Sequence, residues 1–249
     1  MEIINLHLNA TFILLSLVPS FAWLVFFLRE DVHPEPKRMI LKVFFSGMLA
    51  AIPVLMVQVC FRDLFDYLKI EQYSYFSFVC FAAVEEIVKF SVAYMAVRRS
   101  IHFDEPIDAM IYLVTAALGL AMVENLAIIT KVKDLSEAIN VTMLRFVGAT
   151  LLHALSSGLV GYYWARNFIR VRVAEFITFR GRFLVLEGLI MATILHATFN
   201  YLIIAHREFL FYPIMFLMVA AMFILWDFEK IKARSLARIA LKKSKRENI

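Results

Sequence analysis

The chain has 249 residues, of which 62% are hydrophobic and 19% charged, with a formal net charge of +5. This composition excludes a disordered or fibrous chain. Runs of about 20 residues are apolar on all sides, which is typical of membrane-spanning helices and not of a soluble domain. The basic residues flank these runs, as in the tail from Lys230 to Arg246, where they meet anionic headgroups, so nucleic-acid binding is not expected. Cys60 and Cys80 lie in apolar runs and indicate neither a disulfide framework nor a zinc finger.

Seven apolar segments follow in chain order, at about residues 10–28, 39–60, 73–97, 107–130, 139–164, 183–205 and 209–226. The first has no basic leader, so we expect a retained helix and not a cleaved signal peptide. Pro53 predicts a kink in the second segment. Asp104 or Glu105 is expected to cap the fourth, with Pro106 in its first turn. The sequence therefore predicts an all-α, polytopic bundle of about seven transmembrane helices, forming one domain over residues 1–249.

The distribution of basic residues predicts the orientation. With the N-terminus outside, the inner segments hold about 19 Lys and Arg residues and the outer segments about 5. We therefore expect the N-terminus outside and the C-terminus inside, in a multi-pass protein of the cell (cytoplasmic) membrane.

Charged groups stand in the middle of the third apolar segment, at Glu85, Glu86 and Lys89. Each charge at the centre of a spanning helix costs ~3 kcal/mol or more, so these groups require partners. The next three segments supply polar candidates, which are Glu124, Asn125, Arg145, His153, His196 and Asn200. At ~1.5 Å of rise per residue, the groups lie roughly 9–21 Å from the outer surface in the orientation above. The alternating helices thus bring them into one band in the outer half of the bilayer.

The spacing within the helices suggests roles. Lys89 lies four residues after Glu85, on the same face, and can neutralise one carboxylate. Glu85 and Glu86 point about 100° apart, so one is expected at the reacting centre and the other as a support. Asn200 shares a face with His196 and could orient a water or hydrogen-bond an oxyanion.

These side chains suit two hydrolytic chemistries. In the first, His153, His196 and Glu124 hold a divalent metal, most suitably zinc, and Glu85 is the general base. In the second no metal takes part, Glu85 activates water directly, and the histidines and Asn200 stabilise the oxyanion. The sequence favours the metal scheme slightly, although it lacks a compact H-E-x-x-H motif.

The motifs resemble those of a known family. Glu85-Glu86-Ile87-Val88-Lys89 is similar to the EExxK motif of the PrsW family of intramembrane proteases, in the wider superfamily of the CAAX prenyl proteases. Three further blocks resemble that family in order, together with the early residues 19–23 and 31–36. The first of these three blocks is Asp104 to Ala109 with Gly119 to Asn125, the second is Arg145 with His153, and the third is His196 to Asn200. The sequence departs from the family pattern at Leu120, where Phe is usual, and at Ser157, where some members have Asp.

The resemblance implies a protease domain with catalytic spans at about 73–205 and a basic cytoplasmic tail at about 228–249. It implies cleavage of a membrane-tethered protein near the extracytoplasmic surface, such as site-1-type cleavage of an anti-sigma factor or a similar signalling protein. Glu85, Glu86 and Asn200 would be catalytic, with Lys89 as charge partner and Asn125 and Arg145 as supports. The oligomeric state is not predicted.

Other interpretations remain open. The same buried carboxylates and histidines would suit a proton- or cation-coupled transporter, although we find no repeat and few Gly or Pro breaks. A catalytically inactive scaffold or a buried structural ion network would also retain them. Ser156 and Ser157, beside Gly158, favour small-residue packing over a nucleophilic role. Asp104 and Asp108 are expected on the inner side as caps or turn formers.

Overall fold

The computed structural model describes residues 2–174, 179–206 and 209–247, and in these residues the chain forms helices joined by short loops, with no strand. The helices are α1 (Glu2–Leu28), α2 (Lys37–Tyr67), α3 (Tyr75–Val97), α4 (Pro106–Ile129), α5 (Leu135–Val147), α6 (Ala149–Ala174), α7 (Phe179–Ala205) and α8 (Phe211–Glu247). The predicted all-α membrane bundle is confirmed.

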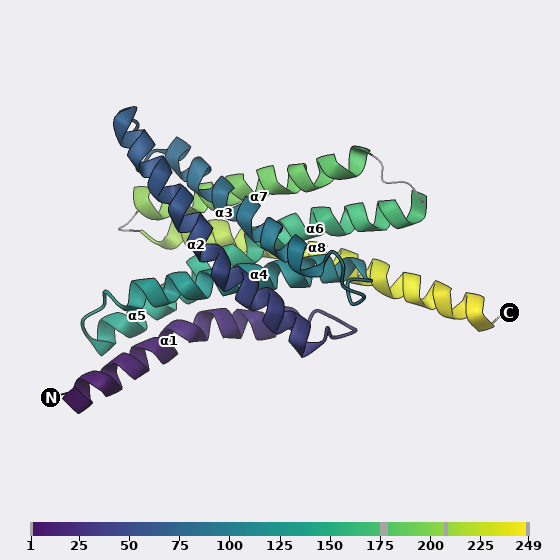
Figure 1. The fold of residues 1–249 in the computed structure, drawn as a ribbon, viewed down its shortest axis with the longest axis horizontal. Coiled ribbons are helices and arrows are strands. Elements are labelled where there is room, and N and C mark those ends of the chain that lie inside the picture. The colour runs from purple at the N-terminus through teal and green to yellow at the C-terminus, as the bar shows by residue number, and fades with distance from the viewer. Residues whose placement is uncertain (1, 175–178, 207–208, 248–249) are drawn as a thin grey trace.

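Within the described residues, six helical segments are long and apolar enough to cross a membrane, with α5 and α6 together making one of them over Leu135–Ile169. The 23-residue α3 has the length of a seventh span, but three charged residues in its centre make it too polar for that criterion. The N-terminus and the C-terminal end of α8 lie toward opposite ends of the bundle (Figure 1).

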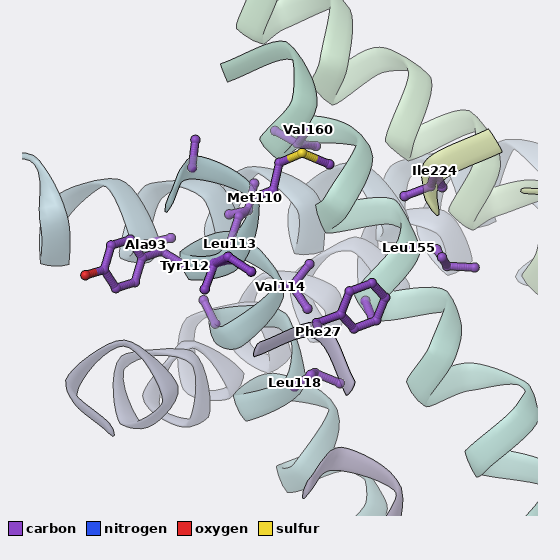
Figure 2. Packing of buried hydrophobic residues seen from close by; sticks show 14 of the residues in the cluster. Phe27, Ala93, Met110, Tyr112, Leu113, Val114, Leu118, Leu155, Val160 and Ile224 are labelled. Atoms are coloured by element: carbon purple, nitrogen blue, oxygen red, sulfur yellow. The ribbon is translucent and has the colours of Figure 1, made fainter. Parts of the chain in front are cut away.

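The centre of the bundle is α4, which contacts α1, α2, α3, α5, α6 and α8. Every side chain from Pro106 to Met122 is buried, so this helix has no lipid-facing side over that length. Figure 2 shows Met110, Leu113, Val114 and Leu118 of α4 at the middle of the apolar core. A helix that is hydrophobic all round is surrounded by other helices, and here it forms the axis of the bundle.

Glycines allow two neighbours to approach α4 closely. A Cβ at Gly47 of α2 would meet the backbone of Ala116, and one at Gly161 of α6 would lie 2.7 Å from the Cα of Met110. Small residues at such crossings are the usual means of close helix packing in membranes.

The structure differs from the sequence prediction at three places. The fifth predicted span is broken at Gly148 into α5 and α6, α2 continues to Tyr67 through Pro53, and α8 continues from the last span into the basic tail. At the break, a Cβ on Gly148 would lie 2.6 Å from the carbonyl oxygen of Leu144, so only glycine fits. The indole of Trp23 in α1 donates a 2.8 Å hydrogen bond to the carbonyl of Phe146. This bond serves a carbonyl that no longer has its helical partner, which matters because an unpaired backbone group in a bilayer is costly.

Candidate active site

The middle of α3 presents three buried charges to the inside of the bundle. The ammonium of Lys89 lies 2.6 Å from Oε1 of Glu86, and both side chains are fully buried. The pair is thus three residues apart, where the sequence had suggested Glu85 with Lys89. Lys89 Nζ also lies 3.4 Å from Nδ1 of His153 and 3.4 Å from Oγ of Ser156 on α6. One lysine therefore ties α3 to α6.

Both histidines are oriented by carboxylates. Nδ1 of His196 lies 2.7 Å from Oε1 of Glu86, and Nε2 of His153 lies 3.0 Å from Oε2 of Glu124. A carboxylate only accepts, so we assign the ring proton to each of these nitrogens. The other ring nitrogens, Nε2 of His196 and Nδ1 of His153, then carry lone pairs, and the one on Nδ1 of His153 also accepts from the Lys89 ammonium at 3.4 Å.

Glu85 faces these two lone pairs. Its Oε2 lies 3.6 Å from Nε2 of His196 and 3.8 Å from Nδ1 of His153, and the atom is buried without a hydrogen-bond partner in the described chain. Its other oxygen accepts a 2.8 Å hydrogen bond from the side-chain amide of Gln58 on α2. Gln58 therefore fixes the carboxylate so that its unpaired oxygen points toward the histidines.

A second layer supports Glu124. Arg145 Nη2 lies 3.0 Å from Oε2 of Glu124, and Arg145 also donates to Oδ1 of Asn125. The Asn125 amide reaches Thr150 on α6 at 3.2 Å and Ser20 on α1 at 3.4 Å. Arg145 and Asn125 thus connect α4, α5, α6 and α1 around the histidines.

The band expected from the sequence is therefore one connected cluster. It brings together Glu85, Glu86, Lys89, Glu124, His153 and His196, with Asn125 and Arg145 behind them. Asn200 lies one turn beyond His196 on α7, half-buried, and lines the same space as Glu85. Ser157 is buried with an unpaired hydroxyl, whereas Ser156 faces Lys89.

Sequence reasoning missed Gln58, Trp23 and Ser20. Gln58 is a polar residue inside an otherwise apolar run, and that alone could have marked it as a partner for a buried charge. No sequence signal pairs Trp23 with Phe146, because the bond depends on the break at Gly148.

The residues fit a metal ion. Ligand atoms of Glu85, His153 and His196 all lie within 4.8 Å of one another, and this Glu and two His set is one that zinc uses in hydrolases. Metal-binding histidines commonly donate their second ring N–H to a carboxylate, as both do here. Glu124, which the sequence suggested as a ligand, lies outside this set, and its Oε2 is 3.0 Å from Nε2 of His153.

The same arrangement lacks one positive charge. Three carboxylates, Glu85, Glu86 and Glu124, face two permanent cations, Lys89 and Arg145. With neutral histidines, the formal charge of the cluster is negative, and burial of net charge is unfavourable. A proton between Glu85 and the histidines would balance it, and a divalent metal ion there would change the net charge from negative to positive.

Comparisons with known proteins agree with this geometry. Residues 35–226 match the sequence profile described as PrsW family intramembrane metalloprotease. The chain belongs to the PrsW family. The Protease PrsW of Geobacillus kaustophilus is 25% identical over 195 residues, 78% of this chain and 79% of that protein. The Protease PrsW of Bacillus subtilis is 25% identical over 221 residues, 88% of this chain and 92% of that protein.

No solved structure matches the chain. Membership of the PrsW family and six apolar helices make it a multi-pass membrane protein of a peptidase family. In this PrsW family chain the matched region contains Glu85, Glu86, Lys89, Glu124, His153, His196 and Asn200.

Proposed function

We propose that the protein is an intramembrane protease that hydrolyses a peptide bond in a membrane-tethered protein, with Glu85 as the residue that activates water. The observation that supports this is the unpaired Oε2 of Glu85, which lies within 3.8 Å of a lone-pair nitrogen on each histidine. Buried oxygens of Glu86 and Asp31 are also unpaired, so it is the two imidazole nitrogens facing Oε2 of Glu85 that support a chemical role for it.

In the proposed reaction, Glu85 takes a proton from water as the oxygen attacks the carbonyl carbon of the scissile bond. The side-chain amide of Asn200 donates to the oxyanion that develops on the carbonyl oxygen. Glu85 then gives the proton to the nitrogen as the C–N bond breaks, and an acid and an amine leave. Gln58 holds Glu85 in place, Lys89 pairs with Glu86, and Glu86 orients His196.

We also propose a zinc ion at this site, held by His153, His196 and a carboxylate oxygen of Glu85. When bound, zinc would lower the pKa of a coordinated water and polarise the substrate carbonyl. Glu86 and Glu124 would orient the two histidines toward it. In the zinc-bound form Glu85 would be a ligand and not the base, and Glu124 would orient His153, whereas the sequence suggested Glu124 as the ligand and Glu85 as the base.

The proposed orientation places the N-terminus outside and the basic tail inside, in the cytoplasmic membrane, where the tail meets anionic headgroups. The site then lies in the outer half of the bilayer, which suits a bond near the extracytoplasmic surface. The substrate class proposed from the family resemblance is an anti-sigma factor or a similar signalling protein.

The test is cleavage of single-span tethered proteins by the full-length chain in nanodiscs, with wild type compared with His196→Gln. Wild type should cleave, lose activity in a chelator and regain it with zinc, and bind zinc, whereas His196→Gln should fail in all three. Cleavage by fully metal-free wild type would refute the zinc assignment and leave Glu85 as the water activator. Equal cleavage by both proteins would refute the protease site.

A transporter would use the same buried groups differently. Liposomes loaded with a pH-sensitive dye distinguish the two functions, because a transporter would show proton or cation flux that His196→Gln abolishes. We expect no such flux.

A further inference from the structure

Two hollows lie on either side of Phe78 and Asn200. The first has a volume of about 310 Å³ and reaches Glu85, while the second has a volume of about 350 Å³ and extends away from it. Both volumes fall at the lower end of the range of ligand pockets. Because Phe78 and Asn200 line both, an extended peptide crossing Asn200 would place neighbouring residues in the two hollows.

The first hollow, called the polar pocket below, opens between α2 and α3. Its polar lining consists of Gln58, Arg62, Gln72, Glu85 and Asn200. Among these side chains the one permanent cation is Arg62, which is exposed at the outer part of α2. Its guanidinium favours an acidic or carbonyl-bearing side chain.

The second hollow, called the apolar pocket below, lies where α5 breaks from α6 and faces α7 and α8. Its lining is aliphatic and aromatic apart from Arg145 and Asn200, and it includes Leu144, Val147, Phe199, Ile203 and Ile214. The break at Gly148 is part of its wall, so a continuous helix there would present a different surface.

Asn200 stands at the junction of the pockets. No hydrogen bond holds its side-chain amide among the described residues, although it is half-buried and near the charged cluster. A free amide at this point can pair with the backbone of a peptide, which has an acceptor and a donor at every residue.

Resting on the proposed protease function, we propose that the apolar pocket binds one large apolar side chain of the substrate next to the scissile bond. The polar pocket binds an acidic or amide side chain on the other side of that bond. The substrate class is thus a tethered protein cut where an apolar stretch gives way to a polar one. This juncture is where a transmembrane segment leaves the bilayer.

Ile203 offers the sharpest test, because it lines the apolar pocket, does not line the polar pocket and is not one of the residues of the charged cluster. Ile203→Trp would fill the pocket. Ile194→Trp is the matched control, since Ile194 lies on the same helix, is 46% exposed and lines neither pocket. Arg62→Glu inverts the charge of the polar pocket.

The experiment measures cleavage by the full-length chain in nanodiscs. The probes are single-span fusion proteins that share one membrane segment and vary at the residues beside the cleaved bond. Wild type should favour Leu or Phe over Ala on one side of the bond. Ile203→Trp should lower the ratio of the cleavage rates of the Leu or Phe fusions to that of the Ala fusion by about 10-fold or more. Ile194→Trp should keep it. Arg62→Glu should shift the preference on the other side from acidic to basic residues.

Binding of the same fusions to Glu85→Gln protein gives a readout that does not need catalysis. If wild type cleaves and Ile203→Trp leaves both the cleavage and the binding preference unchanged, the pocket assignment is wrong and the protease function stands. If no fusion is cleaved but Ile203→Trp removes the binding preference, the pocket stands and the protease function is wrong.

Discussion

Carboxylates gather at two places in this protein, and the comparison separates a reactive cluster from a structural one. The histidine cluster comprises Glu85, His153 and His196, and the loop cluster comprises Asp31, Glu35 and Asp108. In each, the potential ligand atoms lie within 4.8 Å of one another. By proximity alone the two are equivalent.

Their partners differ. In the loop cluster, the Tyr112 hydroxyl donates to Glu35. The backbone amides of Asp104 and Glu105 donate to Asp108 at 2.9 and 2.7 Å. The backbone amide of His33 donates to Asp31 at 3.0 Å. These donors carry no full charge. The histidine cluster instead uses Lys89, Arg145 and two imidazoles. Both clusters leave a buried carboxylate oxygen unpaired, Oδ2 of Asp31 and Oε2 of Glu85, but that of Glu85 lies within 3.8 Å of two imidazole nitrogens.

Through these uncharged donors, the loop cluster connects the α1–α2 loop to the start of α4. Burial raises the pKa of Asp31, and the charge of Glu105 raises it further. Burial also raises the pKa of Glu35, with the charge of Asp31 adding to the effect and the Tyr112 hydroxyl opposing it. Proximity of carboxylates alone therefore does not identify a functional site, and the groups that they contact must also be compared.

The largest expected effect separates the clusters by activity. Glu85→Gln should lower cleavage of a tethered substrate by about 10²–10⁴-fold, the usual contribution of a general base. Glu35→Gln, the matched change in the loop cluster, should alter it by less than about 3-fold, since a conservative change that keeps the hydrogen bond is nearly neutral. A large loss in both variants would show that the two clusters act together.

The second prediction concerns charge balance. Lys89→Met leaves Glu86 buried without its cation, which should cost about 3–5 kcal/mol. The expected fall in apparent Tm in detergent is about 6–20 °C. Adding Glu86→Gln should recover most of the loss, because no buried charge is left alone. If the double variant is no more stable than Lys89→Met, the pair is not what stabilises this part of the bundle.

A third prediction concerns positioning. Gln58→Leu removes the hydrogen bond to ionised Glu85, and such bonds contribute about 1.5–3 kcal/mol, or roughly 10- to 100-fold in kcat. Gln58→Glu should be no better, because a second carboxylate would repel Glu85. The pH profile of kcat should move in Gln58→Leu, which loss of packing alone would not cause.

Tyr112→Phe is the matched change in the loop cluster. It removes the donor to Glu35 and should lower the apparent Tm while cleavage per folded molecule stays at the wild-type level. A selective fall in kcat would contradict the structural role of the loop cluster.

The smallest expected effect is a pH dependence of stability from the loop cluster. A carboxyl whose folded pKa is raised contributes stability that is fully present below its unfolded pKa of about 4 and is lost as pH rises through the folded value. The apparent Tm should therefore fall as pH rises from about 4 through the raised folded pKa values of Asp31 and Glu35. The titratable groups that face Asp31 and Glu35 are His33, His102, Glu105, Asp108 and Tyr112.

The double variant Asp31→Asn and Glu35→Gln should flatten that profile, because amides do not ionise. His33→Gln is the control for the histidine that pairs with Glu105 at 3.3 Å. If His33→Gln flattens the profile and the double variant does not, the titration belongs to the histidine.

Much of the fold follows from the sequence, because long apolar runs in a bilayer can only form helices. The depth argument also brought Glu85, Glu124, His153 and His196 together. The identity of the lysine partner could not be predicted, since Lys89 can reach residues three and four positions away on a helix. The break at Gly148 could not be predicted either, because an isolated glycine is tolerated within helices and its effect here depends on the position of α1.

The burial of α4 has a consequence for biogenesis. This helix leaves the ribosome after α1–α3 and before α6–α8, so half of its final neighbours do not yet exist when it enters the membrane. The side of α4 that later packs on α6 then faces lipid or the insertion machinery until α6 arrives. The bundle and its histidine site therefore cannot form until the C-terminal helices have been inserted and have packed against α4.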